Sequence, residues 1–469
     1  MINSRQLKIN FIFVIFAQLV TLIVSCITNL LLPKFITTLS YSYWQLFIFY
    51  AGYVPCLALG LNDGVYLRLG GKRINELDKT ALKSQYLFGQ IFQIGEAILF
   101  FLLFIWFIED KSKALVFCLV LLYFVSYTSY NFLSNVFQSI NKINIYAIAT
   151  IIFQFIYFVF QLAFILKKQS NIFILITCYI FANFISVLYL IKNISSLFKK
   201  IKFNFKTGYC ETFISMKIGI SLMFANVCSM LVLGVGRQII ELKWGILKFG
   251  KISFALSLIN FALMFIIQIG AVLFPALRRL NSEYLKEVFI NLTNRLFIIL
   301  PFIYLAYIPG KMVLEMWIPK YTESIEYLGI LLPICFFDCR MNLINSTMFK
   351  VLNKQLLLLE INLITIGISV VTGLIGAYII NNMYFVVLSL VFSVAVRCII
   401  SDYIISKWMK FNINVYILFD VILSVLFIVI ANSKFEVVIL TLIVSIILRF
   451  FTVKFLQGRA KDVKSFKIR

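Results

Sequence analysis

Long apolar runs dominate this sequence, and they constrain its fold more than any other feature. A helix that crosses the hydrocarbon core of a bilayer needs roughly 20 consecutive, mostly apolar residues. Residues 10–32 form one such run, and by the same length criterion we find about fourteen of them along the chain. Because the bilayer core offers no water to backbone polar groups, these runs predict transmembrane α-helices.

The composition agrees with a chain that lies in lipid. Of its 469 residues, 62% are hydrophobic and only 13% are charged, whereas ordinary globular domains are about half apolar and about a quarter charged. A soluble chain of this length cannot hide such an excess in a core, because too much of its surface stays exposed. The loops are also too short for a separate soluble domain, so we predict an integral membrane protein.

We therefore predict an all-α membrane protein of about fourteen transmembrane helices. Each helix corresponds to one apolar run, and polar or charged residues mark the boundaries. The predicted helices cover about 10–32, 44–62, 86–108, 115–138, 145–166, 172–192, 213–234, 252–276, 289–308, 326–349, 356–379, 384–406, 412–431 and 436–455.

The formal net charge of +24 is explained by membrane topology. A basic soluble protein would suggest nucleic acid as a partner, but here most Lys and Arg residues lie in alternate loops and at both termini, as in cytoplasmic segments. We expect both termini in the cytoplasm and no nucleic-acid partner. One segment departs from the pattern, because it is basic yet falls on the opposite side; it contains Arg237, Lys243, Lys248 and Lys251.

A weak internal repeat relates the first six predicted helices to the next six. Three matches recur at one separation of about 210 residues, which makes them worth more together than singly. The matched pairs are Asn131 with Asn342, Arg68 with Arg278, and Gln18 with Asn226.

The repeat predicts two parallel six-helix bundles, because six is even and both halves then have the same orientation. Transporters built from such repeats bind their substrate between the halves. The expected organisation is an N-terminal bundle, a basic cytoplasmic linker, a C-terminal bundle, and an additional helix pair with a basic tail. These parts cover residues 1–192, 193–212, 213–406 and 407–469.

The sequence argues against an enzyme. It contains no histidine, which excludes His-based catalytic triads, and it has neither a Walker loop nor a metal-ligand cluster. Most of the nine cysteines lie inside apolar runs, unlike a disulfide framework. Cys335 and Cys339 are four residues apart and could hold a metal, but small packing residues are the simpler interpretation. We expect no metal and no cofactor.

Polar side chains inside the apolar runs are the candidates for a substrate cavity, because such groups usually face a bundle interior. Arg340 could be a cavity cation for an anionic substrate, or could form an ion pair with Asp338, Glu96 or a neighbouring helix. Lys217 could line the cavity, or its long stem could carry the ammonium to the interface. Four amides join them as candidates, with interhelical hydrogen bonding as the alternative: Gln18, Asn131, Asn226 and Asn342.

Two acidic residues are candidates for ion or proton coupling. Glu96 lies in the third predicted helix and Asp338 in the tenth. Pairing with a buried cation is the alternative for Glu96, and an ion pair with Arg340 is the alternative for Asp338, since an unpaired carboxylate is costly in lipid.

The segment at residues 60–72 reads GLNDGVYLRLGGK and is the most distinctive of the predicted cytoplasmic segments. Its glycines permit a tight turn at a helix end. Its charges could form a cytoplasmic gate, for which Asp63, Arg68 and Arg278 are the candidates. The alternative is a helix cap followed by a solvated loop.

This segment resembles the end of the second helix in polysaccharide-exporting flippases of the Wzx type. These proteins belong to the exporter superfamily that also holds multidrug (MATE) transporters and lipid II flippases. Further similar stretches are WGILKFGKISFA at residues 244–255, LFPAL at 273–277 and WIPKY at 317–321. The resemblance covers the first twelve helices.

The resemblance implies alternating access by two six-helix bundles in a bacterial inner membrane. The implied substrate is an O-antigen or capsular repeat unit carried on undecaprenyl pyrophosphate, and cavity cations such as Lys217 and Arg340 would suit the pyrophosphate. The implied partners are this lipid-linked oligosaccharide, membrane lipids, the polymerase and other assembly proteins. A drug or small-cation exporter, which would need an acidic cavity, and a polysaccharide polymerase are the alternatives.

Overall fold

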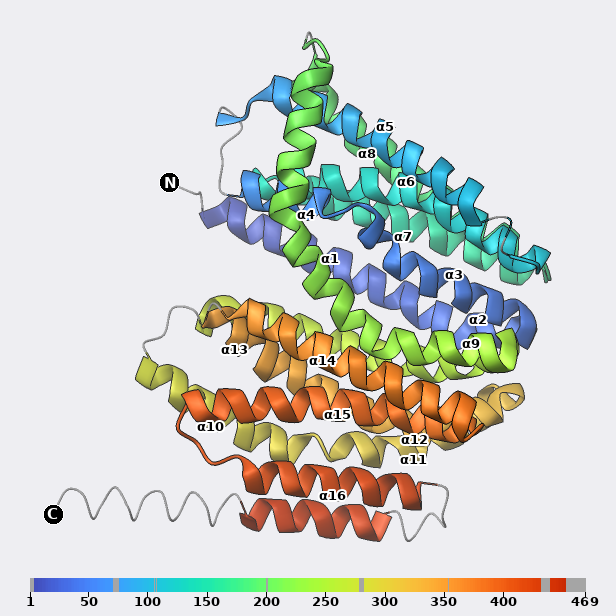
Figure 1. Ribbon diagram of the computed structural model, residues 1–469, viewed down its shortest axis with the longest axis vertical. Helices are drawn as coiled ribbons and strands as arrows, with labels where there is room; N and C mark the ends of the chain where they lie inside the picture. Colours follow the sequence, from blue (N-terminus) through green and yellow to red (C-terminus); the bar gives the residue numbers. More distant parts are fainter. Residues whose placement is uncertain are drawn as a thin grey trace, which may run out of the picture. The chain divides into compact units, whose positions relative to one another are not determined.

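The computed structural model describes residues 4–70, 76–104, 106, 108–199, 201–277, 282–352, 354–431 and 439–452. Within them the chain is helical, and it divides into two compact units, Met1–Met230 and Leu231–Arg469. Each unit is a bundle of long helices (Figure 1).

Unit 1 is built from nine labelled helices that follow one another along the chain, the last of which continues into unit 2 (Figure 1). Their bounds are α1 (Ser4–Cys26), a π-helical turn (Ile27–Leu31), α2 (Leu32–Phe35), α3 (Thr38–Leu57), α4 (Leu61–Leu69), α5 (Lys79–Phe104), α6 (Lys111–Ser139), α7 (Ile143–Leu166), α8 (Ile172–Phe198) and the beginning of α9 (Phe205–Leu277).

Unit 2 contains the rest of α9 and the helices that follow it. Their bounds are α10 (Ser282–Ile299), α11 (Phe302–Trp317), a 3₁₀ turn (Pro319–Tyr321), α12 (Thr322–Arg340), a π-helical turn (Met341–Asn345), α13 (Ser346–Val351), α14 (Gln355–Leu374), a π-helical turn (Ile375–Ile379), α15 (Met383–Trp408), α16 (Asn414–Ile430) and a last helix, Ile439–Thr452.

Side-chain caps mark where several helices begin. Asp110 accepts hydrogen bonds from the backbone of Ser112 and Lys113 at the start of α6, and Asn171 accepts one from Phe173 at the start of α8. Such caps satisfy backbone N–H groups that have no partner within the helix. The polar interruptions between apolar runs therefore act as helix starts.

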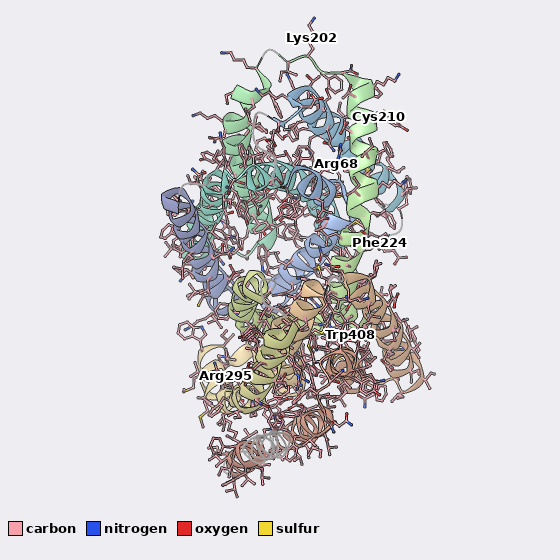
Figure 2. All side chains as sticks on the ribbon, turned by 90° about the vertical axis from the view of Figure 1, so that its left-hand side faces the viewer. Arg68, Lys202, Cys210, Phe224, Arg295 and Trp408 are labelled. Carbon is pink, nitrogen blue, oxygen red and sulfur yellow. The ribbon has the colours of Figure 1, made fainter. Side chains whose placement is uncertain are left out.

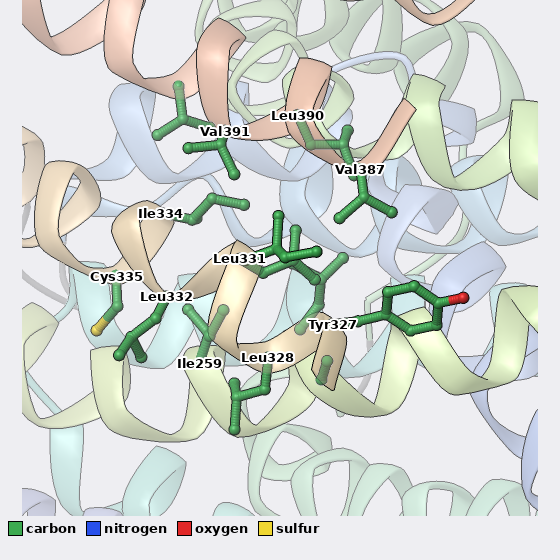
Figure 3. Close-up of a cluster of buried hydrophobic side chains, with 14 of the residues drawn as sticks. Ile259, Tyr327, Leu328, Leu331, Leu332, Ile334, Cys335, Val387, Leu390 and Val391 are labelled. Atoms are coloured by element: carbon green, nitrogen blue, oxygen red, sulfur yellow. The ribbon is translucent and has the colours of Figure 1, made fainter. Parts of the chain in front are cut away.

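The core of unit 2 surrounds α12. Leu331 and Ile334 of α12 are fully buried, and they lie among Ile259 of α9 and Val387 and Leu390 of α15 (Figure 3). Nearly every residue of α12 is buried, which is why this helix is apolar all round instead of along one face. Side chains on α12 are therefore held rigidly from every side.

The predicted fold class is confirmed. Ten helices in the described part of the chain are long and apolar enough to cross a membrane, or eleven when α3 and α4 are counted as one bent span. Helix α9 contains two of the predicted helices, 213–234 and 252–276. Two shorter apolar helices lie near the C-terminus, Asn414–Ile430 and Ile439–Thr452. Most of the predicted apolar runs are thus helical in their described parts. Run 44–62 is interrupted by a turn before Leu61, and run 289–308 is divided between α10 and α11 at Leu300 and Pro301.

Two boundaries differ from the sequence prediction. The basic linker predicted at 193–212 is largely helical, because α8 continues to Phe198 and α9 begins at Phe205. The division between the units falls at Met230 and Leu231, inside α9. We call residues 205–230 the N-terminal segment of α9; it belongs to unit 1.

A single glycine interrupts α9 where the sequence predicted a loop between two helices. Gly245 has φ 81° and ψ 177°, whereas helical structure continues on both sides of it. This conformation is essentially restricted to glycine. The residues around it otherwise favour a helix, so the chain changes direction at one residue without a longer loop.

Gly245→Ala should therefore destabilise unit 2 by about 1–3 kcal/mol through backbone strain alone. A Cβ at Gly245 would meet no other atom within 4 Å, so steric overlap adds nothing. Thermal unfolding of the purified protein measures the effect. Gly367→Ala is the matched control, because that position is equally open but helical; equal effects of the two variants would contradict the prediction.

Candidate functional site

The second predicted membrane helix is broken near its end. Helices α3 and α4 meet at an angle of 57°, and Leu59 and Gly60 between them have positive φ values of 47° and 77°. Pro55 lies within the last turn of α3, and its backbone nitrogen has no hydrogen to donate to the helix. Broken helices of this kind line cavities in membrane transporters, because their freed backbone groups need protein or water as partners.

Helix α4 contacts the N-terminal segment of α9 backbone to backbone. A Cβ on Gly64 would lie 1.9 Å from the carbonyl oxygen of Ser215, and a Cβ on Gly219 would lie 2.0 Å from that of Gly60. No other residue type fits at these positions without moving one helix. Small residues at such crossings let helices gain close van der Waals contact in lipid, where the hydrophobic effect does not drive association. We call this contact the α4–α9 seam.

A polar group closes one end of the seam. Arg68 donates to the Glu211 carboxylate at 2.6 Å and to the Ser215 hydroxyl at 2.8 Å. Gln85 of α5 donates to the same hydroxyl at 2.7 Å and to the Glu211 carbonyl at 3.0 Å. Figure 2 shows Arg68 beside the α9 ribbon that carries Cys210. The Arg68 and Glu211 side chains are 28% and 25% exposed, so water weakens this ion pair.

The predicted gate residues have different surroundings. Arg68 contacts α9 as just described, while Arg278, its expected counterpart, lies outside the described residues. Asp63 is partly buried on α4 and lies near Tyr127 of α6. Asn131 lies one turn beyond Tyr127 on α6 and is partly buried.

Arg340 lies at the centre of a second polar group, which is buried in unit 2. Its guanidinium contacts Asp402 of α15 at 2.9 Å and also pairs with Asp420 of α16. The side chains of all three residues are only 3% exposed. The charge of Arg340 is therefore balanced within the protein, which favours the ion-pair alternative over a cavity cation.

Asp420 extends this group to the last helix. Its other oxygen accepts from Arg449 at 2.7 Å, and Arg449 also donates to the carbonyls of Phe297 and Phe419 at 3.1 and 2.9 Å. The guanidinium of Arg449 lies 4.4 Å from the Phe297 ring centroid, a favourable cation–π distance. Asp420 thus joins α12, α16 and Ile439–Thr452.

Asp338 does not pair with Arg340, contrary to one of the partners considered from the sequence. It pairs with Arg397 of α15. Residues two apart on a helix do not face each other, so the two charges on α12 have different neighbours. Asp338 is therefore balanced by a cation of another helix, a partner that the sequence analysis did not consider. We call the six residues the buried ion network: Asp338, Arg340, Arg397, Asp402, Asp420 and Arg449.

Of this network, the sequence analysis singled out only Asp338 and Arg340 as candidates. Arg397, Asp402 and Arg449 lie inside predicted helices, and the rule that singled out Arg340 applies equally to them. Three arginines and three aspartates in neighbouring apolar runs are the signal that could have identified them.

A π-helical turn, Met341–Asn345, directly follows Arg340. Such turns insert an extra residue into a helix and re-aim the side chains around it. Asn342 donates to the carbonyl of Asp338 at 2.9 Å, and buried Asn345 donates to that of Cys398 at 3.4 Å. The amide of Asn342 is therefore used within its own helix.

The remaining candidates are scattered over unit 1. Lys217 and Asn226 are exposed on the N-terminal segment of α9, and Gln18 is partly buried on α1. Glu96 of α5 is partly buried, and its Oε2 atom is buried with no hydrogen-bond partner among the described residues. Lys217 and Arg340 belong to different units, so a shared cavity for both stays a prediction.

The cysteines and acidic residues form no metal site in the part of the chain that the structure describes. Cys335 and Cys339 are buried on α12 among apolar side chains.

The two units together have the fold of multi-helix membrane transporters. No protein-family profile and no curated protein sequence matches the chain. Several solved structures match the chain. A lipid II flippase, MurJ, in an inward closed conformation matches with a TM-score of 0.67 and 13% identity, covering 97% of this chain and 99% of that one.

Multidrug MATE family transporters of the MOP superfamily match as well. An inward-facing one has a TM-score of 0.66 and 12% identity, covering 82% of this chain and 94% of that one. An outward-facing one has a TM-score of 0.58 and 11% identity, covering 86% and 95%. At these identities the likeness establishes the MOP-superfamily fold.

The contributions of Asp338 and Arg397 to the free energy of unfolding should depend on each other. Arg397→Met or Asp338→Leu alone leaves an uncompensated buried charge and should cost about 3–5 kcal/mol, whereas the double variant should cost far less than the sum. Thermal unfolding of the four proteins measures this coupling. Additive losses would mean that the two charges do not depend on each other.

Proposed function

We propose that this protein is a flippase that moves undecaprenyl-pyrophosphate-linked oligosaccharide repeat units across the inner membrane by alternating access. The observation that carries the proposal is the extent of the likeness to the lipid II flippase. That structure covers 97% of this chain, whereas the inward-facing MATE transporter covers 82%. The resemblance of residues 60–72 to polysaccharide exporters is the reason for proposing an oligosaccharide as the group carried on the lipid.

The α4–α9 seam is the best candidate for the cytoplasmic gate. It combines a broken helix, a backbone contact that leaves no gap, and a partly exposed ion pair between Arg68 and Glu211. An ion pair of this kind contributes little to stability, typically about 0–1 kcal/mol, so breaking it in each transport cycle costs little.

Lys217 is the cation that we place beside the substrate's pyrophosphate. It is exposed on the same segment of α9 that forms the seam, and no acidic partner balances it among the described residues. Arg340 no longer serves this purpose, because Asp402 and Asp420 neutralise it.

A drug or small-cation exporter is the second candidate, and Glu96 favours it. This carboxylate lies within a membrane helix with a buried oxygen that has no described partner, as a cation site would require. The buried aspartates of unit 2 do not favour it, since each is paired with an arginine.

Deletion of the gene in its native bacterium tests the function directly. Loss of surface polysaccharide, with repeat units held on the cytoplasmic leaflet, is the expected result. Repeat units that reach the outer leaflet but stay unpolymerised would indicate a polymerase. Intact polysaccharide with altered drug tolerance would indicate the exporter.

Charge exchange tests the gate in the complemented deletion strain. Arg68→Glu and Glu211→Arg should each reduce surface polysaccharide several-fold, because each places two like charges at the seam. The double exchange should restore much of it. Thermal unfolding of the purified variants, which should change little, separates a gating defect from misfolding; a double variant no better than the singles would refute the pairing.

Lys217→Ala should lower surface polysaccharide several-fold at normal protein level in the membrane, because it removes an attraction to the pyrophosphate. Lys206→Ala, an exposed lysine on the same segment, is the control and should have little effect. Equal polysaccharide from the two variants would indicate that Lys217 only reaches the interface.

A further inference from the structure

A groove runs between α15 and α16 on the outer face of unit 2. Its volume is about 520 Å³. The walls are apolar, and Leu418 is 59% exposed, so the groove is accessible from outside the protein. The apolar lining residues are Ile399, Ile400, Ile417, Leu418 and Val421.

Polar and basic groups gather at one end of this groove. Tyr403 and Asn414 complete its lining, at the end where α15 stops and α16 begins. The ammonium of Lys407 lies 4.4 Å from the centroid of the Tyr403 ring, which holds a cation at the mouth. Exposed Lys410 follows in the short connection.

The acidic groups near the groove do not neutralise these lysines. Asp402 and Asp420 are neighbours of lining residues, but both are buried and paired with Arg340 on the inner side of the same helices. The mouth of the groove is therefore cationic while its walls are apolar. Basic pockets between transmembrane helices on the cytoplasmic side bind the headgroups of anionic lipids.

We propose that this groove binds an anionic phospholipid, with its phosphate on Lys407 and Lys410 and one acyl chain against α15 and α16. The distance along α15 from Lys407 to Ile399 is roughly 12 Å, less than half the thickness of the hydrocarbon core. A site of this depth suits a lipid that resides in one leaflet better than a carrier that must cross both.

The bound lipid stabilises the attachment of the C-terminal helices. Arg340 holds the inner side of α15 and α16 together through Asp402 and Asp420, and the acyl chain fills the space on the outer side. The inference does not depend on the substrate of the proposed flippase.

The test uses the full-length protein, purified in detergent and delipidated. Added phosphatidylglycerol should raise the unfolding temperature by several degrees, as expected for a ligand in excess over its Kd. Phosphatidylcholine with the same acyl chains should have much less effect. Native mass spectrometry of the same samples counts the bound lipid.

Two variants address the two halves of the site. Lys407→Ala with Lys410→Ala removes the charge, and Ile400→Trp fills the groove; both should abolish the selective shift and the bound phosphatidylglycerol. The control is Lys202→Ala with Lys206→Ala, which removes two exposed lysines of unit 1 and should keep the full response.

Three results would overturn the inference. One is a phosphatidylglycerol response that survives both site variants, and another is an equal response to phosphatidylcholine. The third is stabilisation by undecaprenyl phosphate or inorganic phosphate but not by phosphatidylglycerol. If a site variant does not fold, native mass spectrometry of the wild-type protein at rising salt replaces it as the test. A headgroup held by lysines must be lost as salt screens the attraction, so lipid that stays bound would overturn the inference.

Discussion

A charge buried in a membrane-spanning bundle is tolerated only when the protein supplies the opposite charge. In unit 2 this constraint fixes how the helices meet. Asp420 lies between Arg340 of α12 and Arg449 of the last helix, and Arg340 also reaches Asp402 of α15. Two arginines and two aspartates balance one another here, so removing any one of them leaves a net buried charge, and the positions of these helices depend on one another. The C-terminal helix pair is therefore an integral part of unit 2, although the repeat in the sequence does not include it.

In unit 1, close backbone contact between α4 and α9 holds helices together where unit 2 uses buried ion pairs. Gly64 and Gly219 bring α4 and α9 closer than side chains would allow, and the ion pair between Arg68 and Glu211 lies at the partly exposed edge. The buried ion network is costly to open, whereas the seam combines tight geometry with weak electrostatics. We therefore expect the C-terminal helices to stay assembled during the proposed transport cycle while the seam opens and closes.

Much of the fold could be predicted, but less of the candidate site. The apolar runs predicted the helices, and the rule that intramembrane charges are functional or paired singled out Arg340. The same rule was not applied to Arg397 and Arg449, so their pairing was missed. Asp338 was considered as a partner for Arg340 because it is near in sequence, yet side chains two residues apart on a helix point to different sides. The Arg68–Glu211 pair joins residues 143 positions apart, and no local pattern indicates it.

The sequence by itself determined the class of protein and the course of its helices, because lipid requires long apolar runs with internally bonded backbones. It also supplied glycines at two bends, Gly60 and Gly245, whose positive φ values glycine adopts more readily than other residues. Only the tertiary structure decided which charges pair and which helices touch at their backbones. These choices depend on the rotation and crossing of helices that are distant along the chain, and a linear pattern of apolar and polar residues does not specify them.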